Sequence, residues 1–343
     1  METRYRVLGR TELKVSELGL GGHEYARFLN PVHFPGKRKA EEELSLEELL
    51  ESQSPRNELI EKAIAAGVNY FDTGLIEEAQ SLGIALKTLG RRKDVYIAAE
   101  TLWPLRRLKE NPKARWRMTI SRWVKERLRA LQTDYIDVFN IHMPEDGYSR
   151  ESFEFLIEAL KEIKDLGEIS AIGASSHELR FLAELIRKYD CFDSIMIPYN
   201  YHLQEAREIL FPLCRALNIG VVVMKPFCWP YYGIPFTHFC PPNLDKGGYT
   251  PSQMSLKWIL NSPEVSTIVP GTNTIAELEE NLSIFSKEDR IDEGVLKRCL
   301  DTALSPQGRE KLKELCENEE ISRTRAYIRG YAKRALSLGE GIQ

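Results

Sequence analysis

Short apolar runs bounded by turn residues alternate with longer amphipathic stretches along most of the chain. Near-continuous apolar runs of this kind are typical of strands buried on both faces of a parallel sheet. We predict strands over Leu18–Gly22, Asn69–Asp72, Val95–Ala99, Tyr135–Ile141, Ile169–Gly173, Ser194–Ile197, Gly220–Met224 and Val265–Val269. We predict the intervening helices over Arg56–Ala66, Ala79–Leu89, Thr119–Ala130, Ser152–Leu166, His177–Lys188, Gln204–Ala216, Pro251–Asn261 and Thr274–Asn281.

Eight strands that alternate with helices predict an α/β fold, a closed (β/α)8 TIM barrel, in preference to an open doubly wound sheet. No G-x-G-x-x-G follows the first strand, which also argues against a Rossmann unit. Two short runs, Tyr5–Leu8 and Leu13–Val15, flank a turn and predict a hairpin that plugs one end of the barrel. We assign residues 1–285 to the barrel, with a long insertion over 26–54 that we interpret as a lid, and residues 286–343 to a C-terminal helical extension.

The composition is that of a soluble globular protein, with 343 residues, 43% hydrophobic and 29% charged. The net charge of −4 gives no reason to expect nucleic acid or an anionic membrane as a partner. Six scattered cysteines without a C-x-x-C pair are typical of reduced thiols, and no long apolar run or signal core is present. We expect a cytoplasmic enzyme with a small-molecule substrate, and the oligomeric state is left open.

Polar residues and glycines stand where the predicted strands end, and in a barrel this rim carries the chemistry. They are Gly22, Asp72, Glu100, His142, Ser175, Ser176, Lys225, Gly271 and Thr272. Asp72, Glu77, Glu100 and His142 are the candidate catalytic residues. Carboxylates that share a partly desolvated site cannot all stay ionised, so we expect at least one of them to keep its proton near neutral pH.

Several segments resemble the aldo-keto reductases, and their order and spacing cover about residues 5–285. The matching segments are Tyr5–Gly22, Gly67–Thr73, Leu131–His142, Ile172–Ser176, Tyr199–Asn200 and Pro270–Asn281. The resemblance implies a barrel that binds NAD(P)(H) across its rim and reduces carbonyls with an Asp, Tyr, Lys and His tetrad. Asp72 and His142 fit the family Asp and His, but Glu77 stands at the Tyr position and Glu100 at the Lys position.

The cofactor residues that the resemblance implies are also altered. Ser175 fits the family Ser at the nicotinamide carboxamide, whereas Ser176 replaces its Asn partner and Met196 replaces a Gln. The remaining candidates are Gly22, Lys225, Gly271, Thr272, Asn273, Glu277, Glu280 and Asn281. Of these, residues 271–273 can present donors to phosphate at a helix N-terminus. Glu277 stands where an Arg often binds the 2′-phosphate, so NAD is favoured over NADP.

Two glutamates in place of Tyr and Lys reverse the local charge, and we interpret them as a rebuilt acid–base set with Glu77 as the first candidate proton donor. Such a set suits redox at a carbonyl or hydroxyl group, or a redox-assisted elimination or epimerisation. His23 and Tyr25 are second candidates near the substrate, and the aromatic loop around Trp229 predicts a pocket wall for a ring-containing ligand.

Two alternatives remain open at this point. The first is a catalytically silent barrel that binds a nucleotide or small ligand, because two tetrad residues are replaced. The second is a metal-dependent lyase or isomerase that uses Asp72, Glu77, Glu100 and His142, although no linear motif indicates a metal and none is expected.

Overall fold

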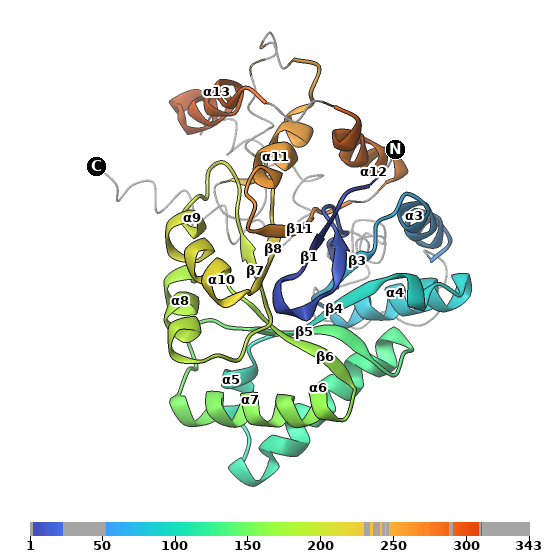
Figure 1. Cartoon of the computed structure of the whole chain (residues 1–343), viewed down its shortest axis with the longest axis vertical. Helices are drawn as coiled ribbons and strands as arrows, with labels where there is room; N and C mark the ends of the chain where they lie inside the picture. Colours follow the sequence, from blue (N-terminus) through green and yellow to red (C-terminus); the bar gives the residue numbers. More distant parts are fainter. Residues whose placement is uncertain are drawn as a thin grey trace.

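A seven-stranded sheet forms the centre of the computed structural model (Figure 1). The structure describes residues 3–22, 53–229, 234–235, 241, 244, 247–272, 274–287, 291–308 and 310. The strands are β3 (Tyr70–Thr73), β4 (Tyr96–Thr101), β5 (Ile136–His142), β6 (Ile169–Ser175), β7 (Ser194–Pro198), β8 (Gly220–Met224) and β11 (Val265–Val269). They pair in parallel in the order β11-β8-β7-β6-β5-β4-β3. Strands that are consecutive in the chain are therefore neighbours in the sheet, apart from the short β9 (Cys228–Trp229) and β10 (Ile234–Pro235), which pair with each other.

The segment Leu18–Gly21 closes this sheet into a barrel. Leu18 forms a parallel bridge to Ile268 of β11, and Leu20 forms one to Phe71 of β3. The Leu20 amide donates to the Tyr70 carbonyl at 2.9 Å, and the Asp72 amide donates to the Leu20 carbonyl at 2.9 Å. The predicted (β/α)8 barrel is therefore confirmed, with its first strand present as isolated bridges.

The N-terminal hairpin plugs the amino-terminal end of the barrel, as predicted. It consists of β1 (Tyr5–Val7) and β2 (Lys14–Ser16), and Leu8 and Val15 are fully buried against the residues inside the barrel. Gly220, the first residue of β8, leaves room for the plug, since a Cβ there would lie 2.6 Å from the Leu8 Cδ1.

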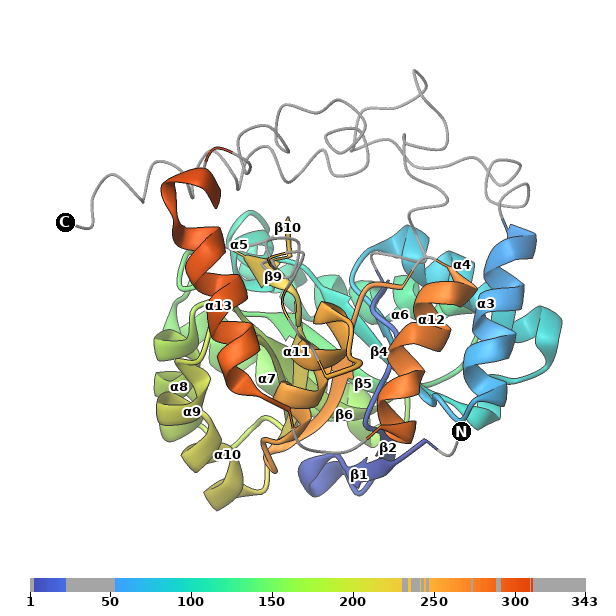
Figure 2. The same cartoon turned by 90° about the horizontal axis from the view of Figure 1, so that it is seen from above.

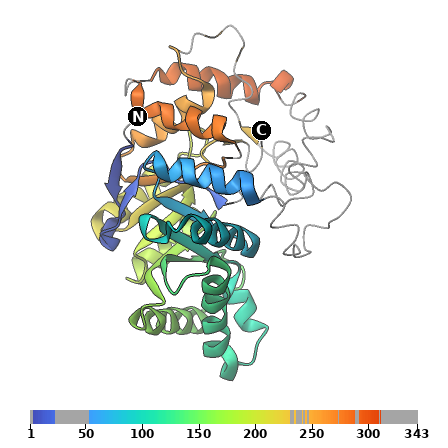
Figure 3. The same cartoon turned by 90° about the vertical axis from the view of Figure 1, so that its right-hand side faces the viewer.

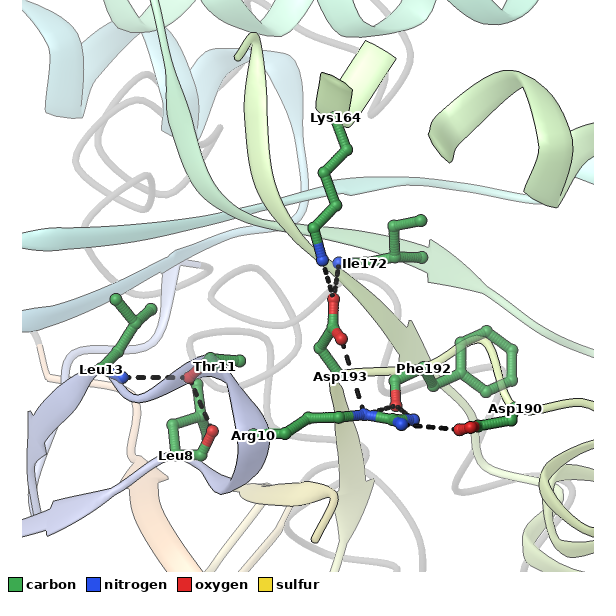
Figure 4. Close-up of polar contacts among 9 residues, drawn as sticks. All are labelled: Leu8, Arg10, Thr11, Leu13, Lys164, Ile172, Asp190, Phe192 and Asp193. Carbon is green, nitrogen blue, oxygen red and sulfur yellow. Dashed lines mark hydrogen bonds and ion pairs between the residues drawn. The ribbon is translucent and has the colours of Figure 1, made fainter. Parts of the chain in front are cut away.

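Arg10 fastens the plug to the loop before β7 (Figure 4). Its guanidinium donates to the Phe192 carbonyl and forms an ion pair with Asp190, with Nη1 to Oδ1 at 2.6 Å. Asp193 lies 3.6 Å from Arg10 Nε and also accepts from Lys164 Nζ at 2.8 Å. Polar contacts thus hold a hairpin whose apolar side faces the barrel.

Helices surround the barrel between consecutive strands. Before the chain reaches β8 they are α3 (Gln53–Ala65), α4 (Ile76–Leu89), α5 (Pro104–Lys109), α6 (Trp116–Leu131), α7 (Arg150–Asp165), α8 (Leu179–Lys188), α9 (Ala206–Ile209) and α10 (Phe211–Leu217). After it come α11 (Pro251–Leu260), α12 (Ile275–Leu282) and α13 (Glu293–Leu304), the last in the expected C-terminal extension. Figure 3 shows α12 beside α3, with α4 next to α3, and Figure 2 places the hairpin and α5 at opposite ends of the barrel.

Several sequence expectations need correction. The helix predicted over Gln204–Ala216 is two helices, α9 and α10, because Pro212 lacks the amide hydrogen that a continuous helix requires. The helix predicted from His177 begins at Leu179, and α5 was not predicted. Cys191 and Cys214 are buried free thiols, but Cys299 is disulfide-bonded, so the expectation of six reduced cysteines is wrong for that residue.

Two segments for which the sequence makes predictions lie mostly or wholly outside the described residues. All but the last two residues of the expected insertion over 26–54 lie outside the described residues, and residues 53–54 belong to α3. Residues 311–343 lie outside them as well. In the part of the chain that is described, no helix combines the length and apolarity that crossing a bilayer requires.

Candidate active site

Three predicted catalytic residues lie at the carboxyl ends of three adjacent strands. The side chains of Tyr70, Ala98 and Val138 pack together inside the barrel. Because side chains alternate along a strand, Asp72 on β3, Glu100 on β4 and His142 on β5 face the same interior. We call the space above them the barrel mouth. Glu100 is 7% exposed, whereas Asp72 and His142 are half-buried.

The turn after Asp72 is held by Glu78, a fully buried carboxylate in the first turn of α4. Its Oε2 accepts from the amides of Gly74 at 2.6 Å and Leu75 at 3.0 Å, which satisfies donors that a helix start leaves free. Gly22 packs against this turn, because a Cβ there would lie 2.4 Å from Glu78 Oε2 and 2.5 Å from the Asp72 carbonyl. The glycine is therefore required by close approach of the two segments.

His142 is neutral at ordinary pH. Burial lowers the pKa of His142 to about 4, and the positive charge of Lys225 acts in the same direction. Its Nδ1 is buried and has no hydrogen-bond partner within the described ranges. The Trp103 ring meets the His142 imidazole edge-on, with ring centroids 5.7 Å apart. The centroid of the His177 ring lies 6.3 Å from that of His142. A neutral imidazole can donate a hydrogen bond that orients a substrate oxygen, but it cannot act as a general acid because it carries no imidazolium proton.

We expect the His142 imidazole to titrate near pH 4 in the folded protein, as followed by proton NMR with a His142→Gln variant for assignment. Replacing Lys225 with methionine should raise this midpoint, because one of the two causes of the depression is removed. The role of Lys225 would be contradicted if the His142 titration midpoint were unchanged in Lys225→Met. It would also be contradicted if Lys188→Met, a change at an exposed lysine, raised the midpoint by the same amount. Since the pKa lies below its unfolded value of 6.5, the associated stability is lost as the pH falls from about 6.5 towards 4.

Glu77 and Glu100 both lie within electrostatic reach of Arg127 on α6. Burial lowers the pKa of the Arg127 guanidinium, while the carboxylates of Glu78, Glu100 and Glu77 raise it. Arg127 Nη2 donates to the Gly74 carbonyl at 3.1 Å, so this side chain reaches the turn that follows Asp72. Glu77 itself is half-buried in the first turn of α4. The carboxylates of Glu77, Glu78 and Glu100 therefore all favour the charged form of Arg127.

The candidate cofactor residues lie on the other side of the rim, on β6, β7, β8 and the start of α12. Ser175 pairs with both His142 and Met196 in the sheet, and the Met196 side chain is packed inside the barrel. The Ser176 hydroxyl donates to the Met143 carbonyl at 2.7 Å and accepts from the Glu178 amide at 3.0 Å, so it stabilises its own loop. Lys225 follows β8 in a left-handed conformation, with φ of 55°.

Where the resemblance predicts the adenosine contacts, Gly271 forms a parallel bridge to Gly21 of the closing segment. Thr272 is buried, and its hydroxyl lies 3.5 Å from the Asn281 amide nitrogen. Glu280 accepts from the Thr250 hydroxyl at 2.5 Å. Glu277 is half-buried in the first turn of α12, where its amide donates to the Thr274 side chain that caps the helix.

Some candidates cannot be placed. His23, Tyr25 and Asn273 lie outside the described residues, as does the side chain of Trp229, whose backbone belongs to β9 (Cys228–Trp229) paired with β10 (Ile234–Pro235). Across the described residues, which include Asp72, Glu77, Glu100 and His142, no group of three or more His, Cys, Asp or Glu side chains lies together in a way that could hold a metal ion.

Three residues beside the site were not predicted from the sequence: Glu78, Asn140 and Arg127. Glu78 could have been found from its position in a helix start, where a carboxylate often caps backbone amides. Asn140 could have been found from strand alternation, because it shares the interior face with His142 and is 1% exposed next to Glu100. Arg127 carries no such signal, since it sits among other charged residues on an amphipathic helix.

Comparison with known proteins agrees with this arrangement. The family model described as "Aldo/keto reductase family" matches residues 49–228 and 244–301. An Arabidopsis thaliana protein named L-galactose dehydrogenase is 24% identical over 304 residues, which are 82% of this chain and 88% of that protein. The uncharacterized oxidoreductase YqkF of Bacillus subtilis is 25% identical over 312 residues, which are 81% and 90% of the two chains.

Solved structures share the fold. The holo form of the aldo-keto reductase AKR11C1 from Bacillus halodurans superposes with a TM-score of 0.63 at 22% sequence identity. The match covers 90% of this chain and all of that one. At this identity the similarity establishes the barrel fold alone, and the chemistry depends on the residues of the barrel mouth.

Proposed function

The chain belongs to the aldo/keto reductase family of oxidoreductases, and we propose that it acts with NAD on a carbonyl or hydroxyl group of a small, ring-containing substrate through an altered acid–base site. The observation that carries this proposal is the barrel mouth. Asp72, Glu100 and His142 face one interior from three adjacent strands, and the buried Glu100 stands where the family has a lysine.

The residues present fit a nicotinamide dinucleotide, the cofactor that this family generally uses. The start of α12 offers backbone donors beside the Thr272 hydroxyl, a donor set suited to phosphate. Ser175, next to His142 in the sheet, suits the nicotinamide end, while Met196 can only pack there. When bound, the cofactor supplies or accepts the hydride.

The charge of Glu277 supports NAD over NADP. Its carboxylate lies in the first turn of α12, close to where the phosphates would be held. A carboxylate at this place repels a 2′-phosphate and accepts hydrogen bonds from ribose hydroxyls. The same helix start therefore selects between the two dinucleotides.

The carboxyl groups of Glu77 and Glu100 carry out the proton transfers. His142, neutral and flanked by the Trp103 ring, donates a hydrogen bond that orients the substrate oxygen. Glu77 gives a proton to that oxygen in reduction and takes it back in oxidation. Glu100, deeper in the mouth, removes a proton from the carbon beside a transient ketone, and Asp72 supports the network.

A carboxylate base beside a transient ketone extends the range of reactions. A proton delivered by water to the opposite face of the carbon, while Glu100 keeps the proton that it removed, inverts a stereocentre, and loss of a neighbouring leaving group with its electron pair gives an elimination. Both suit a polyhydroxylated ring, and one relative of 24% identity is named for L-galactose. We therefore favour a sugar-like substrate.

Calorimetric titration with NAD(H) and NADP(H) tests the proposal. We expect the natural protein to bind NAD(H) more tightly, and Glu277→Gln to gain affinity for NADP(H), because a like charge near the phosphate is removed. The exposed carboxylate Glu279, two residues along the same helix, provides the matched control. Tighter NADP(H) binding by the natural protein would refute the argument from Glu277, and binding of neither dinucleotide would refute the redox function.

A further inference from the structure

Four polar side chains face the interior of the barrel below its mouth. They are Tyr70, Asn140, Ser194 and Thr267, and each residue is at most 1% exposed. Each of them either belongs to the group of side chains packed inside the barrel or stands two residues along a strand from a member of it, so all four point inward. The interior of a (β/α)8 barrel is usually filled by branched apolar residues, and these side chains depart from that pattern.

The polar atoms of these four side chains are buried without a hydrogen-bond partner among the described residues. The atoms are Tyr70 Oη, Asn140 Oδ1 and Nδ2, Ser194 Oγ and Thr267 Oγ1. The described residues include every strand of the barrel wall and the hairpin that plugs it, so neither the wall nor the plug supplies a partner. Buried polar groups in native proteins are almost always hydrogen-bonded, to other protein groups or to ordered water.

The four side chains come from every second strand of the barrel, namely β3, β5, β7 and β11. In a barrel of this kind, the inward side chains of alternate strands approach one another across the interior. The strands therefore direct hydroxyl and amide groups from four sides of the wall towards a common interior.

Gly173 on β6 brings two of these groups together. It pairs with Asn140 of β5 on one side and with Ser194 of β7 on the other. A Cβ at residue 173 would lie 2.0 Å from Asn140 Oδ1 and 3.0 Å from Ser194 Oγ, so both oxygen atoms approach the same point. They do not hydrogen-bond to each other. A water molecule that donates to both oxygens would join β5 to β7 at this place.

We propose that the barrel binds ordered water below its mouth, held by the Asn140 carboxamide and the hydroxyl groups of Tyr70, Ser194 and Thr267. A buried water typically makes about three hydrogen bonds to polar groups that have no other partner. The carboxamide can both donate and accept such bonds, and each hydroxyl can do either. The set therefore contains enough donors and acceptors for water in any orientation.

The chemistry of the site suits water in preference to an ion or a substrate. Its side chains are uncharged, since burial and the nearby charges of Asp72 and Asp137 raise the pKa of Tyr70 and keep its phenol protonated. Asn140 pairs with Glu100 of β4 and precedes His142 by two residues on the same face of β5, so the site lies directly below the mouth. The inference does not depend on the redox function.

Magnetic relaxation dispersion of oxygen-17 in water tests the proposal, because it detects long-lived internal water and does not detect protein hydroxyl groups. The triple variant Tyr70→Phe/Ser194→Ala/Thr267→Val removes the three hydroxyls and nearly keeps the shape of the side chains. We expect this variant to lose the dispersion amplitude of at least one water molecule. Ser286→Ala, a change at an exposed serine, should leave the amplitude unchanged. Equal amplitudes in the natural protein and the folded triple variant would overturn the proposal.

A crystal structure of the natural protein decides the question if the triple variant does not fold. Water oxygens should lie within hydrogen-bond distance of the Asn140 carboxamide and of Ser194 Oγ. Protein groups that take those positions and bond to both side chains would refute the site. Neither experiment involves turnover or dinucleotide binding, so failure of the proposed function would be seen separately.

Discussion

Replacing Glu100 or Glu77 with glutamine should lower kcat by about 10²–10⁴-fold, the usual contribution of general acid–base catalysis. The amide keeps the size and polarity of the side chain but can neither give nor take the proton. Glu100 is buried and pairs with Asn140 of β5 in the sheet, and glutamine has nearly the same shape, so the protein should remain folded while losing its base. The measurement is kcat on any substrate that the natural protein turns over, with NAD(H) affinity measured in parallel.

The two variants should differ in which reactions they lose. Glu77→Gln should impair every reaction at the substrate oxygen, whereas Glu100→Gln should impair exchange of the carbon-bound proton more than simple redox. Solvent deuterium incorporation beside the ketone separates the two. Glu158→Gln on α7 is the matched control, because that carboxylate is exposed on the outer surface. Unchanged kcat in both Glu77→Gln and Glu100→Gln would end the acid–base assignment.

The barrel could be predicted because its pattern is local. The strand predicted over Tyr135–Ile141 is β5 (Ile136–His142), whose β-branched and aromatic residues favour a buried strand. The closing segment Leu18–Gly21 was also recognisable, although its pairing with β3 and β11 depends on residues far away in the chain. Strand ends in turn fix which side chains face the mouth, so Asp72, Glu100 and His142 followed from the same pattern.

Contacts and charge effects between residues far apart in the chain could not be predicted from the sequence. Arg127 belongs to a stretch rich in Lys, Glu and Arg, and only folding shows that its side chain turns to Gly74 while Arg129 stays exposed. The same holds for Lys225, whose charge acts on His142 from a strand three positions away in the sheet. Charge compensation between distant elements has no linear spacing and is visible only in the fold.

Restoring the family residues should convert the protein into a better generic aldehyde reductase. In the Glu77→Tyr/Glu100→Lys double variant, a phenol acidified by a neighbouring ammonium again supplies the proton, and Asp72 and His142 are already in place. We expect kcat/KM for a simple aldehyde to rise above that of the natural protein, by up to about 10²–10⁴-fold where proton donation limits the rate. The measurement is NADH oxidation with a small aromatic aldehyde.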